Sequence, residues 1–274
     1  MKKTRTILVG IGLLFSIHGL LAAGESIFSF ALKGGYALPS SKTLNEGIIA
    51  PANALLQDFR SFLTPLGFEG SLKEGPKISG GFNFGGEIQI RVLKSCHLAL
   101  GIESFQGKSK GWLEGTCGGM YDGTASDLRF DSEYRASFIK IYGTVRFYFP
   151  LGKWRGYAGG GAGFTRAKIS LDESYAQTVN GIDFSSGVTT DGQSTKILPH
   201  INGGVEMPLF GWLKLCADFQ YVIGTIKNFE LTDDSERHPH VGKTLTYWDA
   251  QGIEKEFVWE LSGFQAGLFL RISF

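Results

Sequence analysis

The sequence predicts an all-β fold, an eight-stranded antiparallel up-and-down transmembrane β-barrel with short periplasmic turns and long extracellular loops. Three observations lead to this prediction. Long segments alternate between apolar and polar or small residues, the connections between them are alternately short and long, and the chain opens with an export signal. No stretch after that signal is apolar for long enough to form a spanning helix, so an exported chain can cross a membrane only as a closed barrel.

The first residues have the three parts of a secretory signal peptide. Lys2, Lys3 and Arg5 form a basic start, residues 7–21 are predominantly apolar, and small residues follow at 22–24. This pattern is typical of a cleaved signal for the Sec export route. A membrane-anchoring helix is the alternative, but it needs about 20 apolar residues. We therefore expect residues 1–24 to be removed and residues 25–274 to form the outer-membrane β-barrel domain.

The alternation is clearest in residues 77–92. Period two holds for the whole segment, whereas strands of soluble proteins usually have about five or six residues. Because the side chains of a strand point alternately to its two faces, one face is apolar or Gly and the other is small or polar. The apolar face carries Ile78, Gly80, Phe82, Phe84, Gly86, Ile88, Ile90 and Val92.

Seven further segments complete the predicted barrel. Alternation recurs in residues 28–36, 98–103, 135–149, 196–210, 212–224 and 264–274, and residues 157–171 count as a strand whose many glycines leave its faces unassigned. The total of eight is an even number, which returns both ends of the barrel to the same side of the membrane.

The connections alternate in length. Residues 93–96, 150–154 and 210–212 are tight turns with Gly, Pro or Ser, whereas the connections at 38–76, 114–130, 172–194 and 230–255 are long. Transmembrane barrels have short turns at the periplasmic end and long loops at the extracellular end. Within the long loops, residues 46–65 fit either an amphipathic helix on the outer rim or a self-packed loop, and residues 244–260 predict a hairpin that turns at 249–252.

A soluble β-sandwich also alternates, but the distribution of residues favours the barrel. The polar faces have few of the Lys and Glu side chains that cover a solvated surface, and aromatic residues cluster beside two of the short turns. Aromatic girdles lie at the lipid–water boundaries of transmembrane barrels. The predicted girdle residues are Phe147, Tyr148, Phe149, Trp154, Tyr157, Phe210 and Trp212.

The polar faces predict a lumen filled by side chains, because an eight-stranded barrel is just wide enough for them. The predicted polar network consists of Glu87, Arg91, Glu103, Lys140, Arg146, His200, Glu206, Lys214, Asp218 and Arg271. Counting from the short turns places Glu206 near Lys214 and Glu87 near Glu103, and we expect Arg271 to meet Asp218. Neighbouring carboxylates in a dry lumen need cations, so Arg91, Lys140, Arg146 or Arg271 should reach them. Inward glycines would make room for the large side chains; they are Gly81, Gly85, Gly101, Gly204 and Gly267.

With these features the chain resembles the small eight-stranded outer-membrane barrels of the OmpA transmembrane domain and OmpX type. The resemblance covers the mature chain and rests on architecture, with one specific motif at the carboxyl end. The motif is similar to the signal read by the barrel-assembly machinery, and its residues are Gln265, Gly267, Leu270, Ile272 and the terminal Phe274. The resemblance implies outer-membrane lipid and that machinery as partners, and a location in the outer membrane of a Gram-negative cell.

The expected function is a structural or surface-interaction role through the long loops, with an extracellular ligand that the sequence leaves unidentified. A narrow channel or a ligand-binding barrel is the alternative. The net charge of +1 gives no reason to expect a nucleic-acid partner. We expect no cofactor, and we read Cys96, Cys117 and Cys216 as incidental, with at least one of the three unpaired.

Two motifs raise chemical alternatives that we judge weaker. Lipid A deacylases of similar fold have a strand His with a Ser two residues later, whereas here His200 is followed by Asn202, so the nucleophile is missing and we expect no enzyme. His238 and His240 lie among acidic residues and raise the question of a metal site. Ligands in a loop tip without supporting contacts are usually only solvated, so we expect no metal.

Overall fold

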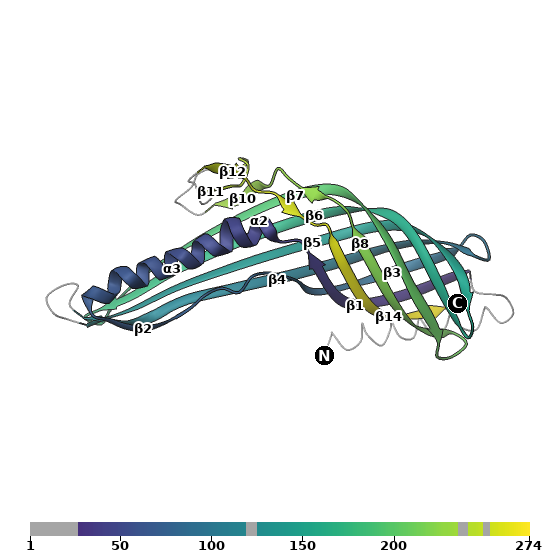
Figure 1. Ribbon diagram of the computed structural model, residues 1–274, viewed down its shortest axis with the longest axis horizontal. Coiled ribbons are helices and arrows are strands. Elements are labelled where there is room, and N and C mark those ends of the chain that lie inside the picture. The colour runs from purple at the N-terminus through teal and green to yellow at the C-terminus, as the bar shows by residue number, and fades with distance from the viewer. Residues whose placement is uncertain (1–26, 119–124, 235–240, 249–252) are drawn as a thin grey trace, which may run out of the picture.

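A computed structural model describes residues 27–118, 125–234, 241–248 and 253–274 (Figure 1). The predicted signal peptide, the turn at 249–252 and both His238 and His240 lie outside the described residues. The helical elements are α2 (Lys42–Leu44), the π-helical turn η2 (Asn45–Ile49), α3 (Ala50–Leu63) and the 3-10 turn η3 (Thr64–Leu66). Among the described helices, none has the length and apolar character to cross a membrane.

Eight strands build the barrel. They are β1 (Phe28–Pro39), β3 (Gly81–Arg91), β4 (Cys96–Gly118), β5 (Ala125–Leu151), β6 (Trp154–Val179), β7 (Ile182–Pro208), β8 (Leu213–Val222) and β14 (Gly263–Ser273). Each pairs antiparallel with the next of these strands along the chain, and β14 pairs with β1. The ring therefore closes, which confirms the predicted eight-stranded up-and-down barrel.

Shorter strands lie outside the ring. They are β2 (Phe68–Lys73), β9 (Thr225–Ile226), β10 (Glu230–Asp234), β11 (Thr246–Trp248), β12 (Glu254–Glu256) and β13 (Trp259–Glu260). The three predicted short turns join β3 to β4, β5 to β6 and β7 to β8, and they lie with the carboxyl terminus at one end of the barrel (Figure 1). The predicted hairpin in residues 244–260 forms as the pair β11–β12.

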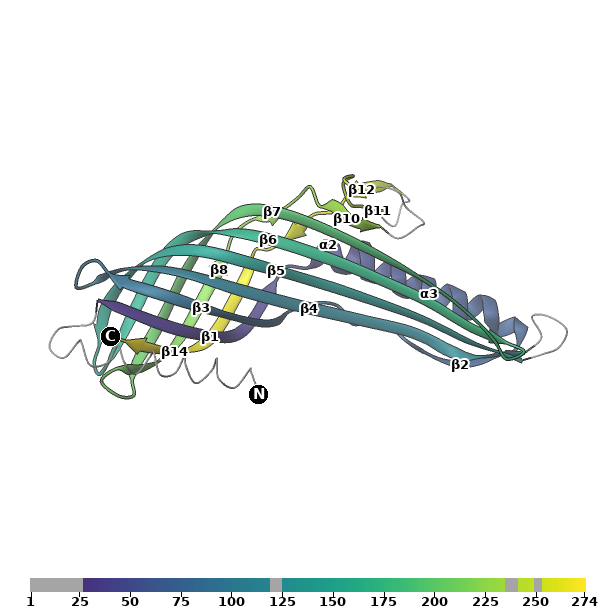
Figure 2. The ribbon, with the colours of Figure 1, turned by 180° about the vertical axis from the view of Figure 1, so that it is seen from behind.

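The long loops predicted at 114–130 and 172–194 are wrong. Strands β4 to β7 continue far beyond the barrel as a curved sheet, which we call the extension (Figures 1 and 2). Pairing between β4 and β5 runs to Gly118 opposite Ala125, and pairing between β6 and β7 runs to Val179 opposite Ile182. The alternation of the barrel strands continues here, with charged instead of apolar residues on most outer-face positions.

The turn between β6 and β7 had a local signal in the sequence. Asn180 and Gly181 both adopt left-handed backbone conformations, with φ of 53° and 75°. Two-residue hairpin turns favour Asn-Gly because both central residues need positive φ. This dipeptide identifies the hairpin that the loop prediction missed.

The segment 46–65, for which helix and self-packed loop were both open, is helical. Helix α3 does not sit on the outer rim but lies along the concave face of the extension (Figure 1). Leu56 and Leu63 are buried there with Leu113 of β4 and Leu128 of β5. The spacing of the buried helical residues turns one stripe of α3 towards the sheet, which holds the helix against β4 and β5.

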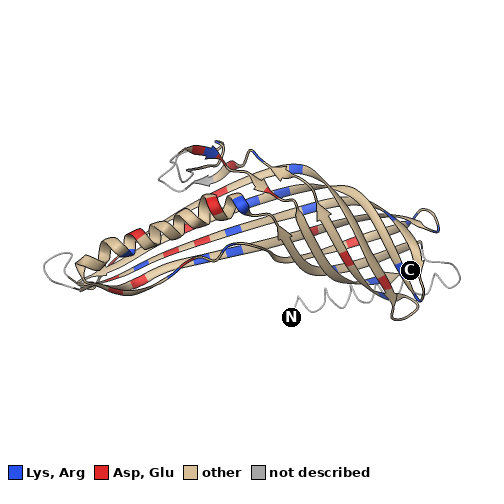
Figure 3. Cartoon of the chain, viewed as in Figure 1, with Lys and Arg blue, Asp and Glu red and all other residues tan. Residues whose placement is uncertain are grey.

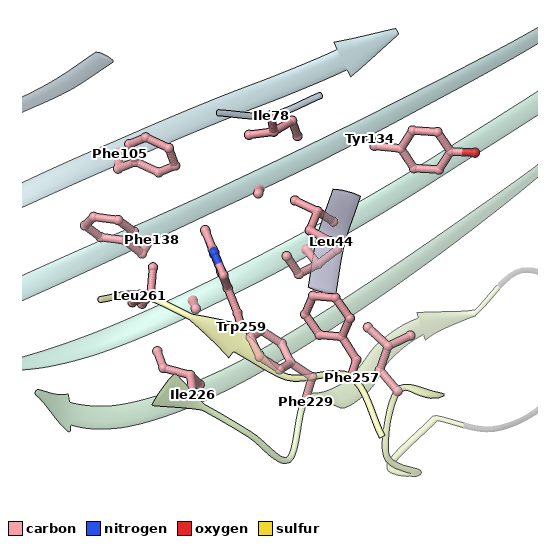
Figure 4. Close-up of a cluster of buried hydrophobic side chains, with 14 of the residues drawn as sticks. Leu44, Ile78, Phe105, Tyr134, Phe138, Ile226, Phe229, Phe257, Trp259 and Leu261 are labelled. Atoms are coloured by element: carbon pink, nitrogen blue, oxygen red, sulfur yellow. The ribbon is translucent and has the colours of Figure 1, made fainter. Parts of the chain in front are cut away.

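A second apolar cluster lies where the extension meets the barrel (Figure 4). Trp259 is fully buried beside the stacked rings of Phe105 and Phe138, and its ring centroid lies 6.4 and 6.3 Å from theirs. Phe229 and Phe257 pack edge to face beside it, with centroids 5.1 Å apart. The cluster draws side chains from the ring strands, the start of the helix and the segment between β8 and β14, so it covers the interior of the barrel from the side of the extension.

Candidate functional site

The outer face of the barrel is an exposed apolar belt. Side chains that alternate along the ring strands are about half exposed or more, among them Leu32, Phe84, Ile102, Ile141, Phe164, Ile201, Phe219 and Leu268. Near the short turns, Phe147, Phe149, Trp154, Phe210 and Trp212 are exposed as the girdle prediction requires. Tyr148 and Tyr157 are the exceptions, because both point into the barrel and are 6% and 2% exposed.

The interior carries the polar side chains. Eight of the ten residues predicted for the lumen network are buried: Glu87, Glu103, Lys140, Arg146, His200, Glu206, Asp218 and Arg271. The two residues closest to the short turns, Arg91 and Lys214, are only partly buried. The network divides into three groups of charges, each centred on a carboxylate.

The first group is centred on Glu87. Arg146 donates to both carboxylate oxygens, with Nη2 2.7 Å from Oε2. Arg271 Nη2 lies 3.3 Å from Oε1, and Lys33 Nζ lies 3.3 Å from Oε2. Tyr142 donates its hydroxyl proton to the same Oε2 at 3.0 Å. Three cations thus share one carboxylate that is 1% exposed.

The second group is centred on Glu103, in the strand next to Glu87. Lys140 Nζ lies 2.7 Å from its Oε2 and Lys33 Nζ lies 3.2 Å from its Oε1. Lys140 also donates to Gln220 Oε1 at 2.8 Å, across the barrel. Of the four cations expected to reach Glu87 and Glu103, Lys140, Arg146 and Arg271 pair with one of them in this geometry, and Lys33 pairs with both.

The third group contains Glu206 and Asp218. Glu206 pairs with Arg271, accepts from the Tyr148 hydroxyl at 2.7 Å and lies 3.8 Å from Lys214 Nζ. Asp218 instead lies 3.5 Å from Lys33 Nζ and accepts from the Tyr157 hydroxyl at 2.5 Å.

The predicted contact between Arg271 and Asp218 is wrong. Asp218 stands opposite Gly267 in the ladder, whereas Arg271 stands opposite Lys214. The two residues are thus four positions out of register, and Arg271 reaches Glu206 and Glu87 instead. The expectation came from residue type and strand adjacency without a count of the register.

The buried charges balance. Lys33, Lys140, Arg146 and Arg271 face Glu87, Glu103, Glu206 and Asp218, so four cations meet four carboxylates. Taking a charge out of water is costly unless it is paired and hydrogen-bonded. This balance explains how a barrel of this width accommodates eight ionised groups in its interior.

The prediction missed four inward residues that hold the network together: Lys33, Tyr142, Tyr148 and Tyr157. Each stands at a polar-face position, and Tyr142 and Tyr157 face glycines on a neighbouring strand, whereas Tyr148 stands opposite Tyr157. A Cβ built on Gly101 would lie 2.5 Å from the Tyr142 ring, and one on Gly204 would lie 2.4 Å from the Tyr157 hydroxyl. The inward glycines therefore make room for rings, and a Tyr beside an inward Gly was the available signal.

Little space remains around these side chains. Gaps of about 20 and 10 Å³ lie beside Lys33 and Lys140. A gap of this size holds about one water molecule. Buried side chains therefore occupy most of the space around Lys33 and Lys140.

The histidine considered for catalysis lies inside this network. His200 Nε2 is 2.7 Å from the Thr144 hydroxyl, and both residues are almost completely buried. In the amide orientation that satisfies both groups, Asn202 accepts from Arg146 Nε at 2.9 Å. His200 Nδ1 has no hydrogen-bond partner, so no third group orients the ring as a nucleophile–base pair requires. The contacts are those of a packed interior.

Charged residues recur along the strands of the extension (Figure 3), and the exposed ones on β4 and β5 lie on the face opposite helix α3. Lys108 Nζ lies 2.8 Å from Glu133, and Lys110 Nζ lies 3.3 Å from Asp131. Arg129 Nε donates a hydrogen bond to Asp131 Oδ2 at 2.6 Å, and this bond lowers the pKa of the Asp131 carboxyl below its usual value. A face of this kind is stable in water and would be costly in lipid.

Four residues of the predicted assembly signal lie in the last ring strand, and Phe274 directly follows it. Gln265 is buried in the interior, Gly267 lies between Gly35 and Asp218, and Leu270 is exposed on the belt. Ile272 pairs with Phe30 and Leu213, and the backbone N–H of Phe274 donates to Phe28 at 3.0 Å. The three cysteines form no disulfide: Cys96 is half-buried, and Cys117 and Cys216 are buried. Within the described residues no group of three or more His, Cys, Asp or Glu side chains is arranged to hold a metal ion.

Comparison with known proteins adds two distant structural likenesses. No protein family and no curated protein matches the chain. The crystal structure of Neisserial surface protein A (NspA) is similar with a TM-score of 0.40 and 12% identity, over 92% of this chain and 100% of that chain. OmpT, an outer-membrane protein of Vibrio cholerae folded in vitro, is similar with a TM-score of 0.18 and 10% identity, over 90% and 96%. Both TM-scores are too low to support a functional argument. The barrel is established by the pairing of its own strands.

Proposed function

We propose that the protein is an integral outer-membrane β-barrel whose closed barrel anchors a surface platform, the extension, for interactions outside the cell. The single observation that carries this proposal is the distribution of polar and apolar side chains in the ring, which is the reverse of that in a soluble protein. Exposed apolar side chains circle the outside of the ring, while balanced charges fill its inside. A soluble protein buries its apolar face, whereas a barrel in lipid presents it.

The dimensions support this role. On β5 the exposed apolar positions run from Leu151 to Ile139, a span of 13 residues. A tilted strand needs about 9–11 residues to cross the hydrocarbon core. Beyond Ile139 the outward positions of β5 turn to Ser137, Arg135 and Glu133, so the strand leaves the lipid there.

The extension reaches far from this boundary. From Ile139 to Ala125, β5 continues for 14 residues, which at about 3.3 Å per residue is roughly 45 Å of strand. A tether to the lipid surface alone would not need this length. The concave face, covered in part by α3, gives the platform a shaped surface for a partner.

Export and membrane assembly complete the proposal. Residues 1–24 would direct export and be removed, and the last strand would be recognised by the barrel-assembly machinery through Gln265, Gly267, Leu270, Ile272 and Phe274. The packed interior and the Trp259 cluster favour a structural role over the alternative of a channel, because the gaps between side chains hold about one water each.

Conductance tests the closed barrel. The refolded full-length mature protein, inserted into planar bilayers, should give no stable openings at voltages that leave the bilayer intact. Reproducible single-channel steps of constant amplitude would contradict the closed-barrel role and establish the channel alternative.

Labelling of intact cells tests the orientation. In a Cys96→Ser background, Thr116→Cys places a thiol on the outer face near the far end of β4, and Lys153→Cys places one in a short turn. A membrane-impermeant maleimide should label position 116 in intact cells and position 153 only after the outer membrane is opened. The reverse pattern would overturn the surface role.

A further inference from the structure

The concave face of the extension holds a groove that the proposed function does not use. Helix α3 covers β4 and β5 and leaves β6 and β7 open, and between the helix and these strands lies a groove of about 430 Å³. Small-molecule sites usually have volumes of about 300–1,000 Å³. The groove is therefore large enough for one molecule of modest size.

The walls of the groove are apolar and partly aromatic. Leu55 and Phe59 line it from the helix, and Phe130, Tyr175 and Val188 line it from β5, β6 and β7. The Leu55 side chain is 65% exposed, and it is not among the buried residues of the same helix, which include Leu56 and Leu63. The helix thus has a second apolar stripe, at a spacing of four residues, that faces the opposite wall without closing against it.

A single ionised group stands among the residues that line the groove. Glu173 of β6 places its carboxylate at the edge, where it accepts from the Tyr134 hydroxyl at 3.1 Å. Tyr175 donates its hydroxyl to Gln177 at 2.6 Å, and burial raises the pKa of Tyr175, so that side chain is neutral at pH 7. The local charge of the groove is therefore negative.

We propose that this groove binds a small amphiphile with an apolar body and one protonated amine. The body would lie between Phe59 and Val188, and the ammonium group would lie between the Glu173 carboxylate and the neighbouring aromatic rings. Carboxylates attract a cation by charge, and the faces of Phe and Tyr rings attract it through their quadrupoles. An anionic amphiphile would meet the same walls but would be repelled at the edge.

The position of the groove argues against a lipid of the surrounding membrane. Phe130 lies nine positions beyond Ile139, the outermost apolar residue of the belt on β5, which is about 30 Å of strand. A lipid that keeps its chains in the membrane cannot reach this far. The ligand is thus a free molecule of the external medium. In this respect the inference rests on the proposed function, which places the extension outside the cell.

Fluorescent probes of opposite charge test the proposal on the full-length mature protein in nanodiscs of zwitterionic lipid. The probe is dansylcadaverine, which joins an apolar fluorophore to one primary amine, and its anionic counterpart is N-dansyl-6-aminohexanoic acid. After subtraction of empty nanodiscs, dansylcadaverine should bind saturably with enhanced, blue-shifted emission, and the anionic probe should bind more weakly. Equal affinity for both probes would overturn the proposal.

Two variants test separately the contributions of the apolar walls and of the Glu173 carboxylate to probe binding. Val188→Trp fills the groove and should abolish saturable binding, while Thr116→Trp, on the convex face of β4, should leave it unchanged. Glu173→Gln should weaken dansylcadaverine about two- to fivefold, the range expected for an exposed ion pair, whereas Glu114→Gln on the exposed outer face should not. Unchanged binding in Val188→Trp would overturn the proposal.

The two proposals fail in distinguishable ways. Probe binding is measured without reference to cells, so a chain that binds dansylcadaverine but conducts ions or is not labelled from outside would contradict the surface role alone. A closed, surface-labelled barrel that binds neither probe would contradict the groove alone.

Discussion

Glu87 on β3 and Arg146 on β5 pair across the intervening strand β4, and the side chains of both are fully inaccessible to solvent. The ladder places Glu87 opposite Gly101 of β4, and Gly101 opposite Tyr142 of β5. The missing side chain of Gly101 leaves room for Tyr142, which donates to the same carboxylate that Arg146 holds. A buried carboxylate, an arginine and a tyrosine of another strand, and a glycine thus depend on one another.

Removing the carboxylate should be costly. Glu87→Ala leaves Arg146, Arg271 and Lys33 with one buried anion fewer, and breaking a buried pair on one side costs about 3–5 kcal/mol. The free energy of unfolding, measured by urea titration in lipid vesicles with the gel shift of folded barrels as readout, should fall by that amount. Glu114→Ala, whose partner Arg129 is exposed, is the control and should change it by less than about 1 kcal/mol. Equal effects of the two variants would contradict the role given to Glu87.

The glycine opposite Tyr142 should tolerate no side chain. In Gly101→Ala the new Cβ would meet the Tyr142 ring at 2.5 Å, and overpacking of this kind costs about 1–3 kcal/mol. Gly143→Ala is the matched control, because its Cβ would meet only Leu100 at 3.5 Å. The same urea titration should show a loss for position 101 and almost none for position 143. A neutral Gly101→Ala would show that Tyr142 moves freely, contrary to a packed interior.

Trp259→Ala should destabilise the apolar cluster that covers the interior of the barrel. The indole is fully buried against Phe105 and Phe138, and Trp→Ala changes in a core cost about 3–5 kcal/mol. Limited proteolysis should then cut the segment between β8 and β14 faster while the ring strands stay protected. Phe62→Ala, on an exposed position of α3, should not change the rate of cleavage. Protection of the segment in Trp259→Ala would argue that the cluster does not hold it.

The outer hairpin of β4 and β5 should lose stability only in strong acid. Because the Arg129 hydrogen bond lowers the pKa of Asp131, this carboxylate stabilises the fold at every pH above its ordinary pKa of about 3.9. The contribution is lost as the pH falls through the lower pKa of the folded state. Hydrogen-exchange protection of the hairpin amides, corrected for the intrinsic rate, should be flat from pH 7 to pH 5 and decline below about pH 4.

Asp131→Asn supplies the control for that measurement. The variant lacks the titrating group, so its protection should be lower at pH 7 and should depend less on acid. If wild-type protection already declined between pH 7 and pH 5, a group other than Asp131 would control the hairpin.

Replacement of the terminal aromatic should affect assembly more than stability. Phe274→Ala removes the last residue of the proposed assembly signal while the backbone bond from its N–H to Phe28 can persist. The amount of folded protein in the outer membrane should fall several-fold, while refolding of the purified variant into vesicles should be unchanged. Ser273→Ala is the control in cells. A refolding defect of the same size would assign Phe274 a structural role instead.

The groove depends on elements that the sequence did not predict together. Residues 46–65 have helical spacing, but their position over β4 and β5 follows from the packing of Leu56 and Leu63 on the extension. Glu173 and Val188 were placed in a loop by the sequence, because their segment is polar. Strand pairing puts them opposite each other on β6 and β7. A site formed by residues far apart in the chain becomes visible only when these contacts are known.

Local periodicity by itself determined the eight ring strands, their order and the faces of all of them except the Gly-rich segment 157–171, because period two is a property of one strand and needs no partner. It also placed most of the interior network, since only inward positions were polar. Tertiary structure alone decided which charges meet: Arg271 pairs with Glu206 and not with Asp218 because the register of β8 and β14 separates them by four positions. It alone also decided that the polar segments 114–130 and 172–194 form the extension, because a charged strand is stable only when its other face is covered, here by helix α3 and the apolar residues beneath it.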